Sequence, residues 1–126
     1  MEINIPEVHA EITAAFRRYV KALSANDIDT VKALFWNSEH TLRYGTGENL
    51  YGMNAISAFR DGQRGHKIEL EITRLVITTF DRDFATANCE MQRLDLGMSS
   101  RMSHSWVRFT EDWRIVAAHV SFGPEE

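Results

Sequence analysis

The sequence predicts an α+β fold in which three N-terminal helices pack on a curved, cone-shaped antiparallel sheet. Apolar residues recur at helical spacing in the first half of the chain, and they form one continuous stripe across residues 6–25. The second half contains four strand-like runs joined by short polar links, which is typical of antiparallel neighbours. A block of helices followed by a block of strands indicates helices that cover one face of a sheet.

The first half of the chain also carries local signals for where each element begins. Pro6 suits the first turn of a helix, and the Asp27 carboxylate can cap a second, short helix. A hairpin is expected before the third helix, with residues 45–49 as its turn. The helices are expected over residues 6–25, just after Asp27, and over residues 53–63. The long strands are expected over residues 67–80, 84–94, 100–109 and 113–122.

The first long strand changes phase along its length. Ile68, Leu70 and Ile72 share one face, whereas Leu75 and Ile77 would share the other. Such a shift indicates a β-bulge, which bends a strand and curls the sheet. Because a sheet curled around a long helix forms a cone, we expect a ligand site at the open end of that cone.

Composition favours one soluble cytoplasmic domain over residues 1–126. The net charge is −4 and there is no basic stripe, so nucleic acid is not an expected partner. No apolar run is long enough to span a bilayer, and the first residues lack the basic region of a signal peptide. Cys89 is the single cysteine, which excludes an intrachain disulfide and fits a reducing compartment. Its strand-like surroundings favour a small buried hydrophobe over a nucleophile.

Tyr19 and Arg43 are polar side chains expected inside the fold. Tyr19 lies on the apolar stripe of the first helix, so its hydroxyl should point inward, either to a backbone carbonyl or to a ligand. Arg43 alternates with Leu42 and Tyr44 in a short strand. If it faces inward it needs a partner, which can be Glu90 or a ligand carboxylate. The alternative is an edge-strand arginine in solvent.

Two histidines near the end of the chain are candidates for acid–base chemistry. His104 alternates with Met102 and Trp106 on one face of its strand. The residues expected to share a face of the last strand with His119 are Trp113, Ile115, Ala117 and Ser121. Both histidines can then face the cavity and act near neutral pH, or each can be satisfied by a backbone partner. No metal-ligand spacing, nucleophile elbow or phosphate loop occurs, so neither a metal nor an organic cofactor is expected.

Three segments of the chain resemble the AtzH/HpxZ-like family of bacterial nitrogen catabolism, which has the nuclear transport factor 2-like (SnoaL-like) cone fold. The first is Asn4-Ile-Pro-Glu-Val with the helix that follows it. The second runs from Ala33-Leu-Phe-Trp to Arg43-Tyr-Gly-Thr-Gly-Glu-Asn-Leu-Tyr-Gly. The third joins Asp83-Phe-Ala-Thr-Ala-Asn to Ser105-Trp-Val-Arg-Phe and Trp113-Arg-Ile-Val-Ala-Ala-His-Val-Ser.

The resemblance implies one of two settings, neither of which needs a cofactor. One is a decarboxylating deamidase of cyanuric acid degradation, which converts dicarboxyurea, an N-carboxylated urea, to allophanate. The other is a protein of oxalurate breakdown that acts on or binds a small ureido carboxylate. In the first setting a helix tyrosine and a strand arginine are the suspected catalytic pair, and they correspond to Tyr19 and Arg43.

The expected site combines these assignments. Catalytic roles are expected for Tyr19 as proton donor, Arg43 as carboxylate anchor and His119 as an orienting or proton-moving group. The expected substrate-binding residues are Trp36, Tyr51, Asn88, His104, Trp106 and Ser121. The expected partners are a small anionic ureido or carboxylate substrate and a second copy of the chain, bound through the open sheet face. The alternative is a non-catalytic module for ligand binding or dimerisation, and the latter would expose Leu75, Ile77, Val107 and Phe109.

Overall fold

The structure is a computed structural model that describes residues 1–110 and 112–124. Its helices are α1 Pro6–Ser24, α2 Ile28–Ala33 and α3 Met53–Asp61. Its strands are β1 Leu42–Tyr44, β2 Asn49–Tyr51, β3 Leu70–Phe80, β4 Phe84–Arg93, β5 Met98–Phe109 and β6 Asp112–Phe122. The predicted order of helices, hairpin and long strands is confirmed. No helix in this part of the chain is long and apolar enough to cross a membrane.

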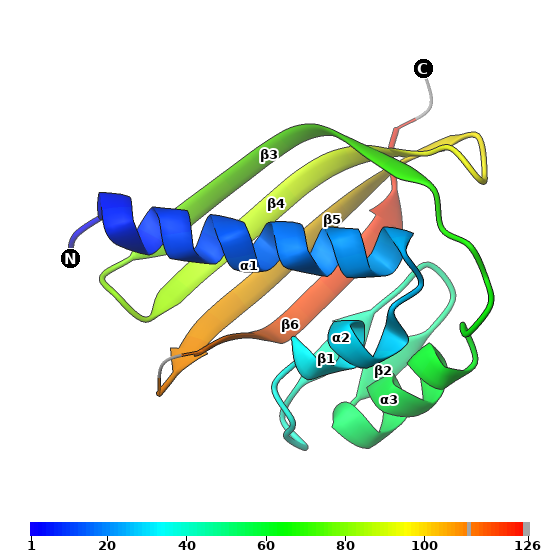
Figure 1. Cartoon of the computed structure of the whole chain (residues 1–126), viewed down its shortest axis with the longest axis horizontal. Helices are drawn as coiled ribbons and strands as arrows, with labels where there is room; N and C mark the ends of the chain where they lie inside the picture. The colour runs from blue at the N-terminus through cyan, green and yellow to red at the C-terminus, as the bar shows by residue number, and fades with distance from the viewer. Residues whose placement is uncertain (111, 125–126) are drawn as a thin grey trace.

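All the strands join one sheet in the order β2-β1-β6-β5-β4-β3. The four long strands form the predicted antiparallel meander. The β1–β2 hairpin extends that meander because β1 pairs in parallel with β6 and antiparallel with β2. Figure 1 shows α1 lying across the long strands, with α2 and α3 beside the hairpin.

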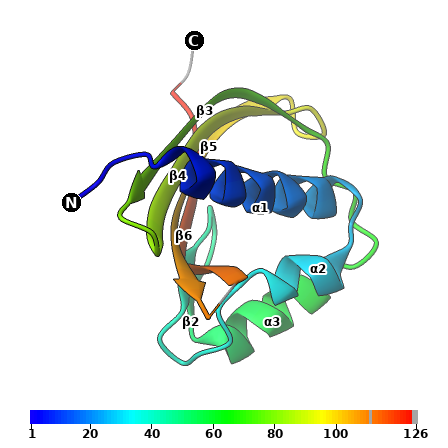
Figure 2. The same ribbon diagram turned by 60° about the vertical axis from the view of Figure 1, so that its left-hand side comes forward.

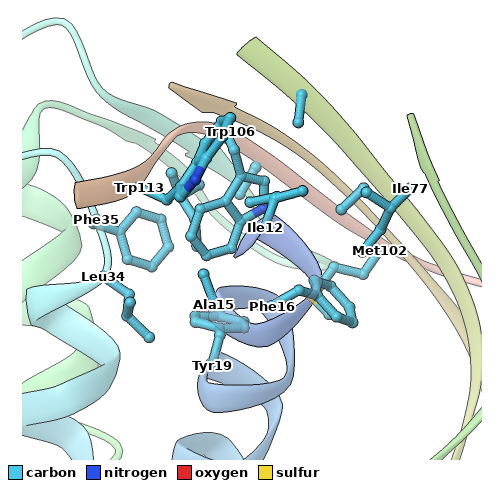
Figure 3. Close-up of a cluster of buried hydrophobic side chains, with 14 of the residues drawn as sticks. Ile12, Ala15, Phe16, Tyr19, Leu34, Phe35, Ile77, Met102, Trp106 and Trp113 are labelled. Carbon is cyan, nitrogen blue, oxygen red and sulfur yellow. The ribbon is translucent and has the colours of Figure 1, made fainter. Parts of the chain in front are cut away.

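The core lies between α1 and the concave face of the sheet, which curves over the helix (Figure 2). The apolar spacing of α1 places one stripe of side chains against the strands. The buried residues of this stripe are Val8, Ile12, Ala15, Phe16, Tyr19, Ala22 and Leu23. Figure 3 shows part of this cluster, in which Trp106 and Trp113 from the sheet meet Phe35 and the α1 side chains. Cys89 is buried in the same core, as predicted, and burial raises the pKa of its thiol to about 11.

The predicted bulge in β3 is confirmed. The register shifts between Ile72 and Arg74, which leaves Thr73 as the extra residue. The extra residue reverses the phase of the strand, so Leu75 and Ile77 return to the concave face and pack against the core. The expectation that these two residues share the opposite face is therefore wrong.

A second bulge, in β6, changes which residues of that strand face the core. Trp106 pairs with Ile115 and Ser105 pairs with Ala117, so Val116 is the extra residue. Ile115 is buried before the bulge and Ala118 after it. The predicted alternation of a single face along the strand is therefore wrong. The residues that the bulge turns to the outer face are Ala117, His119 and Ser121.

Because Ile12 is fully buried between α1 and the sheet, we expect Ile12→Ala to lower the free energy of unfolding by about 2–5 kcal/mol. The matched control is Ile3→Ala, since Ile3 is 52% exposed and should change stability by less than about 0.5 kcal/mol. Urea denaturation of both variants measures the difference. Equal losses would contradict the position of α1 in the core.

Candidate functional site

A cavity of about 440 Å³ lies where the ends of α1 and α3 meet the β1–β2 hairpin and the concave face of the sheet. Three polar side chains from separate elements line it: Tyr19 from α1, Arg43 from β1 and Arg60 from α3. Apolar side chains from the long strands, including Met91, Met102 and Val120, complete the wall. The structure therefore brings together Tyr19 and Arg43, which the sequence predicted, with Arg60, which it did not.

Arg43 is the middle residue of β1, which pairs with β2 on one side and β6 on the other. Its side chain faces inward. The residue is 7% exposed, so the alternative of an edge-strand arginine in solvent is wrong. Its Nη1 donates a hydrogen bond to Oε1 of Glu48 at 2.6 Å. Its Cζ lies 4.9 Å from the ring centroid of Phe59. Glu90 is exposed, so the partner within the chain is Glu48 and not Glu90.

The turn between β1 and β2 sets the position of Glu48. The Gly47 amide donates to Glu48 Oε2 at 3.2 Å, and the Gly45 amide donates to the Glu48 carbonyl at 2.9 Å. A Cβ atom at Gly45 would overlap the Glu48 carboxylate and crowd the Arg43 guanidinium. The turn therefore needs glycine at this position for the ion pair to form.

Tyr19 is 1% exposed, and its hydroxyl lies inside the fold as predicted. The hydroxyl oxygen accepts a hydrogen bond from Arg60 Nη2 at 2.8 Å, instead of contacting a backbone carbonyl. The Tyr19 ring meets the rings of His104 and Phe35 edge-on, at centroid distances of 5.0 and 6.0 Å. These contacts hold the phenol in one orientation.

Arg60 is the functional residue that the sequence analysis missed. It is 3% exposed, and its Nη1 donates to Gln63 Oε1 at 3.3 Å. Its Cζ lies 5.8 Å from the ring of Phe59 and 5.9 Å from that of Phe35. In the described residues no carboxylate lies within ion-pair distance of its guanidinium. A signal was present in the sequence, because Met53, Ile56 and Arg60 follow helical spacing and all three are buried.

Positive charge exceeds negative charge around the cavity. Burial lowers the pKa of Arg60, and the charge of Arg43 lowers it further, while Tyr19 and Glu48 oppose the shift. The Nε atoms of both arginines are buried and have no hydrogen-bond partner among the residues that the structure describes. The lining cations are Arg43, Arg60, Lys67 and Arg93, and the lining carboxylates are Glu48 and Asp95. The described part of the chain has no group of three or more His, Cys, Asp or Glu placed to hold a metal ion. The cavity is therefore suited to a small anion, since guanidinium groups bind carboxylates through paired hydrogen bonds.

His104 faces inward but packs behind Tyr19 and does not line this cavity. Neither of its ring nitrogens has a hydrogen-bond partner in the described residues, so the expected backbone partner is not found. Burial lowers the pKa of His104 to about 3, and the charges of Arg60 and Arg43 contribute. The imidazole is therefore neutral near pH 7, and acid–base chemistry there is not supported.

His119 lies on the outer face of the sheet, away from Tyr19 and Arg43. It is exposed, and its ring meets that of Tyr44 edge-on at a centroid distance of 5.8 Å. The bulge at Val116 explains the difference from the prediction. The other predicted site residues that the structure places on the outer face are Asn88 and Ser121.

The aromatic residues predicted to wall the pocket also lie elsewhere. Trp106 is fully buried in the core, and Tyr51 is 65% exposed. Trp36 stacks on Phe109, with 5.0 Å between ring centroids, in a separate open cleft of about 700 Å³. This cleft is larger than the cavity beside Tyr19. However, none of the residues that line it carries a buried polar atom without a hydrogen-bond partner in the described chain.

The apolar outer face predicted for dimerisation differs from the one observed. Leu75 and Ile77 belong to the concave side, and the ring of Trp36 covers Phe109. Val76 on the edge strand β3 and Phe84 on its neighbour β4 are exposed large apolar residues, at 47% and 38%. Dimerisation through the outer face of the sheet stays a prediction.

Comparison with known proteins agrees with the observed fold. The sequence model of the AtzH-like family matches residues 1–126. A solved protein of unknown function from Pectobacterium atrosepticum is 44% identical, covers 97% of this chain and 95% of its own, and has a TM-score of 0.91. A cystatin-like fold protein from Burkholderia xenovorans is 38% identical over 100% of this chain and 99% of its own, with a TM-score of 0.92.

More distant structures establish the fold. A nuclear transport factor 2-like superfamily protein from Salmonella enterica is 25% identical, covers 94% of this chain and 93% of its own, and has a TM-score of 0.79. The predicted nuclear transport factor 2-like fold is therefore confirmed. No curated protein matches the chain.

The lowered pKa of His104 predicts a loss of stability in mild acid. In the unfolded chain the imidazole takes up a proton near its ordinary pKa of 6.5, whereas in the fold it stays neutral until about pH 3. The contribution of the neutral imidazole to the free energy of unfolding is therefore fully present above pH 6.5. Below that pH it falls by about 1.4 kcal/mol per pH unit. Replacing His104 with Gln should remove this dependence, so the difference in unfolding free energy between the two proteins should change by ~2 kcal/mol between pH 7 and pH 5. Urea denaturation at both pH values tests it, and a constant difference would contradict the neutral buried imidazole.

Proposed function

Because the chain belongs to the AtzH-like family, we propose that it is a cofactor-independent enzyme that decarboxylates a small N-carboxylated urea, converting dicarboxyurea to allophanate. The observation that carries the proposal is the convergence of Tyr19 and Arg43 on one cavity with an excess of positive charge. The family resemblance implies a catalytic pair of a helix tyrosine and a strand arginine at these positions. A volume of about 440 Å³ suits a ligand of this size.

Arg43 is the anchor for one substrate carboxylate. Its Nη1 donates to Glu48, but its Nε is buried and has no partner within residues 1–110 and 112–124. Nε and Nη2 form the edge of a guanidinium that makes paired hydrogen bonds to a carboxylate. A ligand can therefore bind Arg43 while Glu48 keeps the guanidinium in place.

Tyr19 is the proton donor in the proposed step. The bond between the carboxylate carbon and the substrate nitrogen breaks, its electron pair stays on nitrogen, and the carbon leaves as carbon dioxide. The nitrogen takes the proton of Tyr19, and the resulting phenolate regains a proton from solvent. A positioned proton donor contributes about 10²–10⁴-fold in rate. The apolar wall of Met91, Met102 and Val120 limits competing water at the reacting atoms.

Two other functions would share parts of this site. A protein of oxalurate breakdown would use Arg43 in the same way, to act on or bind a small ureido carboxylate. A module for dimerisation alone predicts a filled cone, which does not fit the open cavity beside Tyr19. Turnover of dicarboxyurea separates the proposed enzyme from the oxalurate protein.

Replacing Tyr19 with Phe should abolish release of carbon dioxide from freshly generated dicarboxyurea, because the phenol supplies the proton. Tyr44→Phe is the matched control, since Tyr44 lies outside the cavity and should keep full activity. The measurement is carbon dioxide release by purified, folded protein. Full activity in Tyr19→Phe would rule out Tyr19 as the proton donor. If the wild-type protein released no carbon dioxide, the oxalurate setting or a binding role would be favoured.

The position of His119 leads to a second expectation. Since its side chain lies on the outer face, His119→Ala should leave kcat and KM within about twofold of the wild-type values. The same assay measures both constants. A loss of kcat in this variant would restore the catalytic role that the sequence suggested for His119.

A further inference from the structure

The contact between Arg60 and Tyr19 fixes the direction in which the phenol can donate. Arg60 Nη2 and Tyr19 Oη are 2.8 Å apart, and the two residues are 3% and 1% exposed. A guanidinium carries donors only, so Tyr19 Oη is the acceptor of this hydrogen bond. The hydroxyl hydrogen of Tyr19 must therefore point away from Arg60.

In the described chain the hydroxyl hydrogen of Tyr19 has no acceptor. The only hydrogen bond of this hydroxyl there is the one it accepts from Arg60. The neighbouring His104 ring nitrogens make no hydrogen bond, and Gln63 Oε1 accepts from Arg60 Nη1. A buried donor without an acceptor costs free energy, which a ligand acceptor in the adjoining cavity recovers. The hydrogen is thus available to whatever occupies the cavity.

The charge of Arg60 is also without a counterion in the described residues. The nearby carboxylate, Glu48, is paired with Arg43. A buried cation without a counterion is unfavourable. If Tyr19 gives up its proton, the phenolate forms against the Arg60 guanidinium and turns a neutral hydrogen bond into a buried, charge-assisted pair.

We propose that Arg60 is the positioning residue that presents the Tyr19 hydroxyl hydrogen to the ligand and stabilises the phenolate left after proton transfer. The inference rests on the proposed function and adds a residue to it. The hydrogen passes from Tyr19 Oη to the substrate nitrogen, the electron pair of the O–H bond stays on Oη, and solvent later restores the proton. Charge that develops next to a fixed donor in a water-poor site is stabilised without reorganisation.

The surroundings of Arg60 fit this role. Gln63 holds Nη1, and the rings of Phe59 and Phe35 lie on the guanidinium, so Nη2 stays directed at Tyr19. A lysine at this position would keep the charge but lack the planar guanidinium, which donates to Gln63 from one nitrogen and to Tyr19 from another. Lysine is therefore expected to replace Arg60 in part, and an uncharged side chain not at all.

The kinetic test compares Arg60→Met and Arg60→Lys, with Arg108→Met as the matched control. Arg108 is a partly buried arginine on β5 that pairs with Asp83, outside the cavity. We expect Arg60→Met to lower kcat by about 10²-fold or more with a smaller rise in KM, Arg60→Lys to recover part of the loss, and the control to keep both constants. A raised KM with unchanged kcat would mean that Arg60 only anchors the ligand, which would overturn the proposal. Circular dichroism establishes that each variant is folded.

A binding test separates this proposal from the proposed reaction. Calorimetric titration with malonate compares the wild-type protein, Tyr19→Phe, Arg60→Met and the double variant. If Arg60 acts through the Tyr19 hydroxyl, the two substitutions remove the same interaction. The fold-decrease in malonate affinity of the double variant is then clearly smaller than the product of the two single fold-decreases. Losses that multiply, or a wild-type protein that does not bind malonate, would overturn the proposal. Because the titration needs no turnover, it tests the coupling of Arg60 to Tyr19 even if the wild-type protein is inactive on dicarboxyurea.

Discussion

The burial of two guanidinium groups against a single carboxylate is the constraint on which the arrangement of this site depends. Arg43 and Arg60 come from different elements and share the ring of Phe59, and Glu48 pairs with only one of them. Each group around them limits the cost of that burial. The glycine turn leaves room for the carboxylate, the aromatic ring faces both cations, and the phenol of Tyr19 accepts a hydrogen bond from Arg60. The positive charge left without a counterion in the described residues is the property on which the proposed anion binding rests.

The fold was predictable from sequence wherever apolar and polar residues alternate clearly. The helix stripe and the four strands followed from spacing, and the bulge in β3 followed from a visible change of phase. The bulge in β6 could not be found in this way, because Ile115, Val116, Ala117 and Ala118 are all apolar and show no phase at all. The parallel pairing of β1 with β6 was also not predictable, since it joins segments that are far apart in the sequence.

The site was predictable only in part, and the reasons differ from residue to residue. Tyr19 stood out because a polar group interrupts an apolar stripe, and Arg43 because it is a charged residue that alternates with Leu42 and Tyr44 in a short strand. Arg60 was missed because a cation in the last turn of a helix is usually solvated and interacts with the helix dipole. The position of His119 was predicted wrongly because one unseen bulge reverses every side chain after it. Burial of Arg60 depends on α3 packing against α2 and the β1–β2 hairpin, and on Tyr19 and Phe35 lying against its guanidinium, which local sequence does not report.

The parallel pairing of β1 with β6 has a consequence for when the proposed site forms during synthesis. Tyr19, Arg43 and Arg60 all lie in the first half of the chain and leave the ribosome early. Yet β1 is three residues long, and apart from the equally short β2 its partner in the sheet is β6, the last strand to be made. A nascent chain that lacks β6 has no long strand to hold β1, and with it Arg43, in place against α1. The proposed anion site is therefore complete only when the chain is nearly finished, and proteolytic loss of the final strand would disrupt it while leaving all three polar residues intact.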